Sequence, residues 1–184
     1  GKVGLRAMSR LVRYAYVNPI ILNPDAVYYS YWQDASGDGI IEEDPEIDQL
    51  VEITYNDASS NTEGNLLKYR NKHLLKMDIQ ADTKHMSFGI SARYNSFMQN
   101  VDGIFEDDIF NSDNSPLGLN FGITESRQNF LDGDLIFDAR FAVKINSQIT
   151  LSAIIDNFYN VEYQIRPAYI GPPRTFSVKL AAKI

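Results

Sequence analysis

The feature that most constrains the fold of this sequence is a strict alternation of apolar and polar side chains between residues 134 and 146. The apolar positions are Leu135, Phe137, Ala139, Phe141, Val143 and Ile145. A period of two over a segment this long places one set on each face of a β-strand. Residues 148–157 alternate in the same way after a short turn at Asn146-Ser147, which predicts an antiparallel hairpin.

The same period recurs elsewhere in the chain and predicts an all-β fold, an antiparallel meander of about six long strands. The predicted strands cover residues 3–17, 66–81, 85–98, 133–146, 148–157 and 173–184. A turn near Asp82-Thr83-Lys84 joins the second strand to the third. The first strand alternates less well, because Arg13 shares a face with Leu5, Ala7 and Leu11.

The connections between these strands are of two kinds. Short turns are expected near residues 82–84 and 146–147, whereas longer connections are expected at 18–65, 99–131 and 158–172. Long strands with one apolar face, joined by short turns on one side and long loops on the other, are typical of a transmembrane β-barrel. A soluble antiparallel β-sandwich alternates in the same way and is the alternative.

Charge is strongly segregated along the chain. Residues 17–64 contain 11 acidic residues and no Lys or Arg, and residues 99–131 contain six acidic residues and one base, Arg127. An acidic surface repels phosphate, so we expect no nucleic-acid partner. The sequence has no cysteine and shows neither a Ser/His/Asp set nor a phosphate-binding glycine loop, so we expect no enzyme.

One acidic segment, Gln33 to Pro45, has the spacing of a calcium-binding loop. The candidate calcium ligands are Asp34, Ser36, Asp38, the carbonyl of Ile40, and Glu42. Gly39 stands at the sharp turn, but Pro45 stands where a bidentate Glu is usual. The alternative is a solvated acidic turn in which Gly37 and Gly39 only provide positive φ angles.

The most specific pattern lies near the C-terminus. Residues 156–163 read Asp-Asn-Phe-Tyr-Asn-Val-Glu-Tyr, followed by Arg-Pro at 166–167 and Pro-Pro-Arg-Thr-Phe at 172–176. In order, spacing and position this resembles the closing segment of TonB-dependent outer-membrane receptors, and the strands near Asn71 and Tyr94 resemble those of Bacteroidetes-type members. The matching residues are Asn157, Phe158, Asn160, Tyr163, Arg166, Pro167, Pro173, Arg174 and Phe176. The family usually ends in Phe, whereas this chain ends in Ile184.

The resemblance implies the C-terminal segment of a transporter barrel in the outer membrane of a Gram-negative bacterium, importing a siderophore, cobalamin or a glycan. The implied partners are outer-membrane lipid, the rest of the barrel, a plug domain and TonB, with a surface lipoprotein as a further candidate. Six strands cannot close a barrel of about 22 strands, so we expect a fragment without its plug. The alternative function is a secreted, soluble, calcium-dependent β-sandwich binding module.

Overall fold

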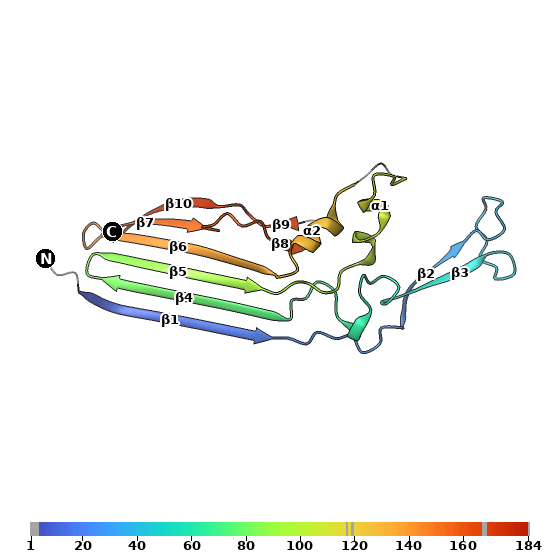
Figure 1. Cartoon of the computed structure of the whole chain (residues 1–184), viewed down its shortest axis with the longest axis horizontal. Coiled ribbons are helices and arrows are strands. Elements are labelled where there is room, and N and C mark those ends of the chain that lie inside the picture. The colour runs from blue at the N-terminus through green and yellow to red at the C-terminus, as the bar shows by residue number, and fades with distance from the viewer. Residues whose placement is uncertain (1–3, 117, 119, 167–168, 184) are drawn as a thin grey trace. The chain divides into compact units, whose positions relative to one another are not determined.

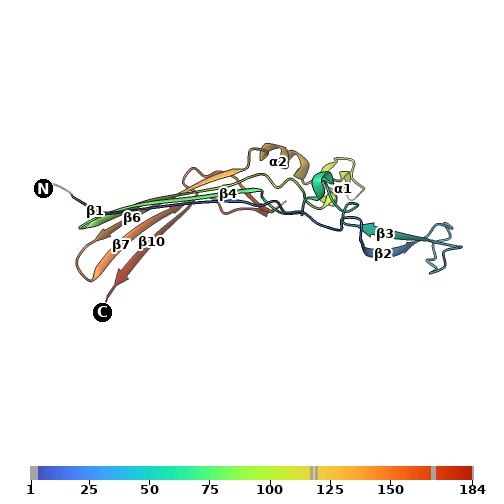
Figure 2. The ribbon, with the colours of Figure 1, turned by 90° about the horizontal axis from the view of Figure 1, so that it is seen from below.

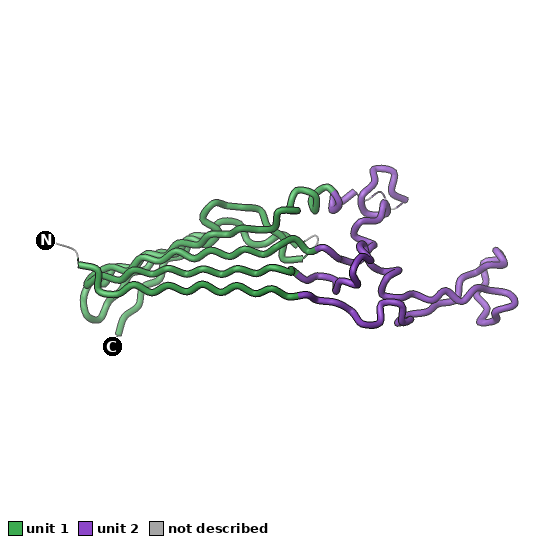
Figure 3. Tube along the Cα trace, turned by 60° about the horizontal axis from the view of Figure 1, so that its bottom comes forward, with its two compact units in different colours: residues 1–17, 71–98, 125–184 green, residues 18–70, 99–124 purple. Residues whose placement is uncertain are grey.

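The chain divides into two compact units in a computed structural model that describes residues 4–116, 118, 120–166 and 169–183 (Figure 3). Unit 1 comprises Gly1–Val17, Asn71–Met98 and Glu125–Ile184, and unit 2 comprises Asn18–Arg70 and Gln99–Thr124. Of the predicted site residues, Pro167 lies outside the described part of the chain, as does Ile184. No helix among the described residues is long and apolar enough to cross a membrane.

Unit 1 is built on one six-stranded antiparallel sheet with the order β1-β4-β5-β6-β7-β10 (Figure 1). The strands are β1 (Leu5–Tyr16), β4 (His73–Thr83), β5 (Met86–Asn95), β6 (Asp134–Lys144), β7 (Ile149–Asp156) and β10 (Thr175–Ala182). Figure 2 shows that the sheet is curved, with β7 and β10 bending out of the plane of β1 and β4. The prediction of an all-β antiparallel meander of six strands is therefore confirmed.

The register keeps the apolar positions of neighbouring strands on the same face. Ile79 pairs with Ile90, and Ile90 pairs in turn with Ala139. The face that contains them, called here the apolar face, carries Met8, Val12, Tyr14, Leu75, Met77, Ile79, Phe88, Ile90, Ala92, Leu135, Phe137, Phe141, Val143, Leu151, Ile155, Phe176, Val178 and Leu180. The opposite, polar face carries Lys76, Asp78, Gln80, Ser91, Arg93, Asp138, Arg140, Lys144, Ser152 and Lys179.

The pairing of β1 with β4 shows which face each residue of β1 belongs to, although its apolar and polar residues alternate poorly. Val12 is opposite Met77 and Tyr14 is opposite Leu75, so the even-numbered residues from Met8 to Tyr16 belong to the apolar face. Leu11 is opposite Asp78 and therefore belongs to the polar face. Arg10 is the exception on the apolar face of this strand, where it is opposite Ile79.

The two ends of the sheet differ in the connections that they carry. The pairs Tyr16–His73, Asn95–Asp134 and Asp156–Thr175 lie at one end, and the three long connections leave from there. At the other end the strands are joined by two short turns. In the first, the Thr83 side-chain oxygen accepts the Met86 amide hydrogen at 2.9 Å, so this turn is centred on residues 84 and 85.

The remaining elements are short. Unit 1 contains the small hairpin β8 (Gln164–Arg166) and β9 (Tyr169–Ile170). Unit 2 contains the hairpin β2 (Val27–Gln33) and β3 (Gln49–Thr54), the 3₁₀ turns η1 (Glu63–Asn65) and η2 (Gly103–Phe105), and α1 (Asp108–Asn111). The helix α2 (Ile123–Asn129) begins where unit 2 ends and continues into unit 1.

Three predictions about the limits of these elements are wrong. The strand expected at 66–81 begins only at His73, because Tyr69 has a left-handed φ of 61° and the Leu67 amide bonds to the Pro19 carbonyl at 2.8 Å. The segment 18–65 is not a plain loop, because its aromatic and β-branched residues pair as β2 and β3. The segment 99–131 likewise contains η2, α1 and α2.

An ion pair crosses the middle strand on the polar face of unit 1. The Arg140 guanidinium of β6 lies 2.7 Å from a carboxylate oxygen of Asp78 on β4, passing over Gly89 of β5. A Cβ atom at Gly89 would lie 2.8 Å from one guanidinium nitrogen, closer than such atoms approach. The glycine therefore leaves the space through which the arginine reaches its partner.

We predict that Gly89→Ala uncouples Arg140 from Asp78. Asp78→Asn should lower the free energy of unfolding by about 0.5 kcal/mol in the wild type, and by close to zero in the Gly89→Ala background. Alanine also rigidifies the unfolded chain, so Gly89→Ala alone is expected to change stability little. Urea unfolding of the four proteins in lipid vesicles measures this double-mutant cycle. In a Ser152→Ala background, Asp78→Asn should cost as much as it does in the wild type. Equal costs of Asp78→Asn in the Gly89→Ala and wild-type backgrounds contradict the prediction.

Candidate functional site

The predicted calcium loop forms the turn between β2 and β3 in unit 2. One Asp34 carboxylate oxygen accepts the Gly37 amide hydrogen at 2.6 Å and the Ser36 hydroxyl at 3.1 Å. The other oxygen accepts the Gly39 amide hydrogen at 2.8 Å. These amides hold the pKa of Asp34 below its usual value. The structure thus brings Asp34 and Ser36 together, with the Asp34 oxygens directed at backbone amides.

Of the other predicted ligands, Asp38 follows the same pattern. Asp38 accepts the Ile40 amide hydrogen at 2.8 Å, and the Glu42 amide donates at 2.6 Å to Asp48. No group of three or more metal-binding His, Cys, Asp or Glu side chains occurs among the residues that the structure describes. Calcium binding at this turn stays a prediction.

Asp48 is a structural residue that the sequence reasoning missed. Its side chain accepts the amide hydrogens of Ala35 at 3.0 Å and Glu42 at 2.6 Å, so it ties both sides of the turn together. Its exposed fraction is 3%, whereas the other residues of the hairpin are exposed or half-buried. In sequence it is one acid among many, and only its contacts across the turn distinguish it.

The turn yields a pH prediction. Because the pKa of Asp34 is lowered in the folded state, its contribution to stability is complete above the ordinary value of 3.8 and is lost as the pH falls through the lowered folded-state pKa. We expect the Gly37 and Gly39 amide resonances to titrate with a midpoint below 3.8. Asp34→Asn should abolish this titration, and a midpoint at or above 3.8 contradicts the hydrogen bonds. Calcium added at constant ionic strength should move these resonances only if the ion binds.

The second predicted site, the closing segment, forms a tightly bonded turn after β7 in unit 1. Asn157 is at its centre, with an exposed fraction of 2% and a left-handed φ of 51°. Its side-chain oxygen accepts the Val161 amide hydrogen at 2.9 Å, and its side-chain nitrogen donates to the carbonyls of Val161 at 2.8 Å and Pro172 at 3.3 Å. Its backbone amide donates to Asp138 of β6 at 3.0 Å.

Asn160 continues the same turn and connects it to the start of β10. It also has a left-handed backbone, with φ 54°, and its amide donates to the Asn157 carbonyl at 2.8 Å. Its side-chain oxygen accepts the Arg174 amide hydrogen at 2.8 Å. The Arg174 guanidinium in turn lies 5.8 Å from the centre of the Phe176 ring. Asparagine suits both positions, because it tolerates left-handed backbone and bonds to the main chain.

The aromatic members of the pattern complete the packing of this turn. The Tyr163 ring is buried against Gly171, where a Cβ atom would lie 2.2 Å from the ring. The Phe158 amide donates to the Phe137 carbonyl of β6 at 2.7 Å. Arg166 is paired with Tyr169 in the β8–β9 hairpin. The structure thus gives these residues a structural role, and Gly171 is a member that the sequence reasoning missed.

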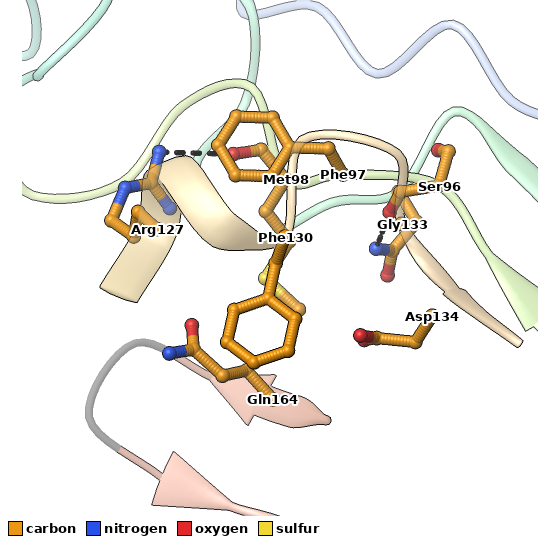
Figure 4. A pocket seen from close by; sticks show the side chains of 9 residues that line it. Ser96, Phe97, Met98, Arg127, Phe130, Gly133, Asp134 and Gln164 are labelled. Carbon is orange, nitrogen blue, oxygen red and sulfur yellow. Dashed lines mark hydrogen bonds between the residues drawn. The ribbon is translucent and has the colours of Figure 1, made fainter. Parts of the chain in front are cut away.

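A small hollow lies beside this segment in unit 1 (Figure 4). Arg127 donates to the Met98 carbonyl at 3.1 Å, and its guanidinium lies 4.7 Å from the centre of the Phe97 ring. Gln164 donates to the Ser126 hydroxyl at 2.8 Å, and one buried oxygen of Asp134 accepts no hydrogen bond from the described residues. The hollow measures about 20 Å³, which is room for one water molecule and too small for a nutrient.

We predict that Asn157 is essential to the closing turn. Asn157→Ala removes three side-chain hydrogen bonds and places a Cβ residue without a polar side chain at positive φ, so the free energy of unfolding should fall by about 3 kcal/mol. Asn157→Gly loses the same bonds without the backbone penalty and should cost about 1 kcal/mol less. Denaturant unfolding of both variants measures the difference. Two variants within 0.5 kcal/mol of the wild type would show that the turn forms without these bonds.

Comparisons with known proteins add little to this geometry. No family model and no curated protein matches the sequence. Among solved structures, the chain is similar to the closed form of the ferric-catecholate import receptor Fiu from Escherichia coli K12, with 17% sequence identity and a TM-score of 0.47. The similarity covers 73% of this chain and 17% of that receptor, so the chain spans about a sixth of its length. A TM-score of this size does not establish a shared fold.

Proposed function

We propose that the chain is a wall segment of a TonB-dependent transporter barrel in the outer membrane of a Gram-negative bacterium. The observation that carries this proposal is the apolar face of the six-stranded sheet, which the register keeps continuous from β1 to β10. The polar face opposite would line the wet interior of the barrel. A two-faced sheet of this kind is what a membrane barrel requires.

Many side chains of the apolar face are exposed. The exposed fraction is 50% at Phe88 in the middle of the sheet and 76% at Val178 on its edge strand. Met8, Val12, Tyr14, Ile90, Phe141, Leu151, Phe176 and Leu180 are exposed as well. A soluble sandwich would cover such a face with a second sheet. These exposed side chains therefore favour lipid over the sandwich alternative.

Strand length and the arrangement of the connections support the same proposal. The six strands contain 8 to 12 residues, close to the length that crosses a bilayer at a tilt. Short turns at one end and long connections at the other are the arrangement of bacterial outer-membrane barrels. Between Met8 and Tyr16 of β1, Arg10 is the basic residue on the apolar face, and its long side chain can reach towards the membrane interface.

The resemblance of the closing segment supplies the finer parts of the proposal. Under it, the complete transporter imports a siderophore, cobalamin or a glycan, using a plug domain and TonB, with a surface lipoprotein as a candidate partner. A Bacteroidetes-type origin belongs to the same proposal. A calcium ion at the β2–β3 turn would make that hairpin more rigid and would take no part in chemistry.

The membrane prediction can be tested with single cysteines, because the chain has none of its own. Ile90 and Ser91 are neighbours on β5 and belong to opposite faces of the sheet. We expect a fluorophore on Ile90→Cys to be quenched by spin-labelled lipid in vesicles, and one on Ser91→Cys to be quenched by aqueous iodide. The full chain is used for both labels.

The two labels form a matched pair, since they differ by one position in the same strand. Quenching of both labels by iodide, with no effect of the lipid quencher, would contradict a membrane wall. A chain that is monodisperse in plain buffer, with Ile90→Cys protected from both quenchers, would favour the soluble sandwich.

A further inference from the structure

The two basic residues of unit 2 line the same hollow. The sequence of unit 2 contains eleven acidic residues in its first segment and five in its second, against Lys68 and Arg70 as its bases. The hollow has a volume of about 380 Å³ and is lined by Tyr28, Tyr55, Leu67, Lys68, Tyr69, Arg70 and Asp102. This volume lies within the range of small-molecule sites.

Lys68 is already neutralised by the protein. Its ammonium lies 2.8 Å from one Asp102 carboxylate oxygen and 4.6 Å from the centre of the Tyr55 ring, and its side chain is only 9% exposed. The Tyr69 hydroxyl donates to the other Asp102 oxygen. Lys68 and Asp102 therefore form a fixed pair in the wall of the hollow, with no net charge.

Arg70 differs from Lys68 in both exposure and pairing. Its side chain is exposed, and it forms no ion pair with the residues that the structure describes. The hollow therefore carries one net positive charge in a unit that is otherwise acidic. An arginine guanidinium offers two parallel donors that match a carboxylate.

Three tyrosines line the same hollow as Arg70. Tyr28 is 60% exposed, and Tyr55 and Tyr69 are partly exposed. Tyr69 has a left-handed backbone, which is rare for a bulky residue, and its amide is held by the Asn100 carbonyl at 2.9 Å. Strained backbone of this kind tends to occur where a side chain must be presented to a ligand.

We propose that this hollow binds a small aromatic carboxylate, with Arg70 pairing to the carboxylate and the tyrosines contacting the ring. The ligand's carboxylate would pair with the Arg70 guanidinium, and the ligand's ring would pack against the tyrosines. An anion without a ring, or an uncharged aromatic molecule, would therefore make only one of these two interactions. The inference concerns unit 2 alone and goes beyond the proposed function without resting on it.

The experiment measures benzoate binding to the full chain in detergent micelles by isothermal titration calorimetry, with empty micelles as the blank. Arg70→Gln should weaken benzoate binding by about tenfold or more, since a charged hydrogen-bonded pair is lost. Arg70→Lys keeps the charge but lacks the planar guanidinium, so its affinity for benzoate should lie between that of Arg70→Gln and that of the wild type. Lys84→Gln removes one charge from an exposed turn of unit 1 and should leave binding unchanged.

Ligand controls separate the two halves of the site. Acetate, inorganic phosphate and benzamide should each bind at least several-fold more weakly than benzoate, and Tyr28→Leu should weaken benzoate binding. The inference is overturned if Arg70→Gln binds benzoate as well as the wild type, if acetate binds as tightly as benzoate, or if a chain folded by circular dichroism binds no benzoate. If the quenching test supports a membrane wall but benzoate does not bind, this inference is overturned and the proposed function is unaffected.

Discussion

The cross-strand register of unit 1 is the constraint on which the rest of that unit depends. Each strand presents alternate residues to opposite faces, so a slip of one residue between β4 and β5 would place Ile79 opposite Gly89 or Ser91 in place of Ile90. The same slip would move Asp78 out of reach of Arg140, because their pair depends on the gap at Gly89. Apolar pairing on one face and ion pairing on the other therefore specify the same register.

The closing segment helps to fix the register of β6, β7 and β10 at the end of the sheet where the long connections leave. Asn157 bonds through its amide to Asp138 on β6 and through its side chain to the Pro172 carbonyl, just before β10. Asp138 lies on the polar face within ion-pair distance of Arg93, so the turn and the sheet share one carboxylate. A family-like pattern here is consequently explained by the geometry of a turn that must join two strands, without any need for chemistry at these residues.

The sequence predicted what depends on local periodicity and missed what depends on distant contacts. Alternation in 134–146 is a property of neighbouring residues, and the strand it predicts lies at Asp134–Lys144. The β2–β3 hairpin is not evident from the sequence, because its Tyr, Val and Ile residues are few within a long acidic segment and form a strand pair only by meeting each other. Tyr69 ends the extended backbone before β4, and no sequence signal marks a tyrosine for a left-handed conformation. The spacing of the acidic turn matched calcium ligands, but spacing does not show that Asp34 bonds to backbone amides.

Unit 2 holds together by a different principle from the sheet of unit 1. Its two chain segments meet at Asn100 and Val101, which are almost completely buried. Asn100 donates to the Leu66 carbonyl at 2.6 Å, and the Ser60 amide donates to the Val101 carbonyl at 3.0 Å. A two-stranded hairpin is marginal alone, so these polar contacts and the turn fixed by Asp48 must supply the order that a large apolar core supplies elsewhere. Because the Lys68–Asp102 pair joins the same two segments, the wall of the tyrosine-lined hollow is also part of what holds the unit together.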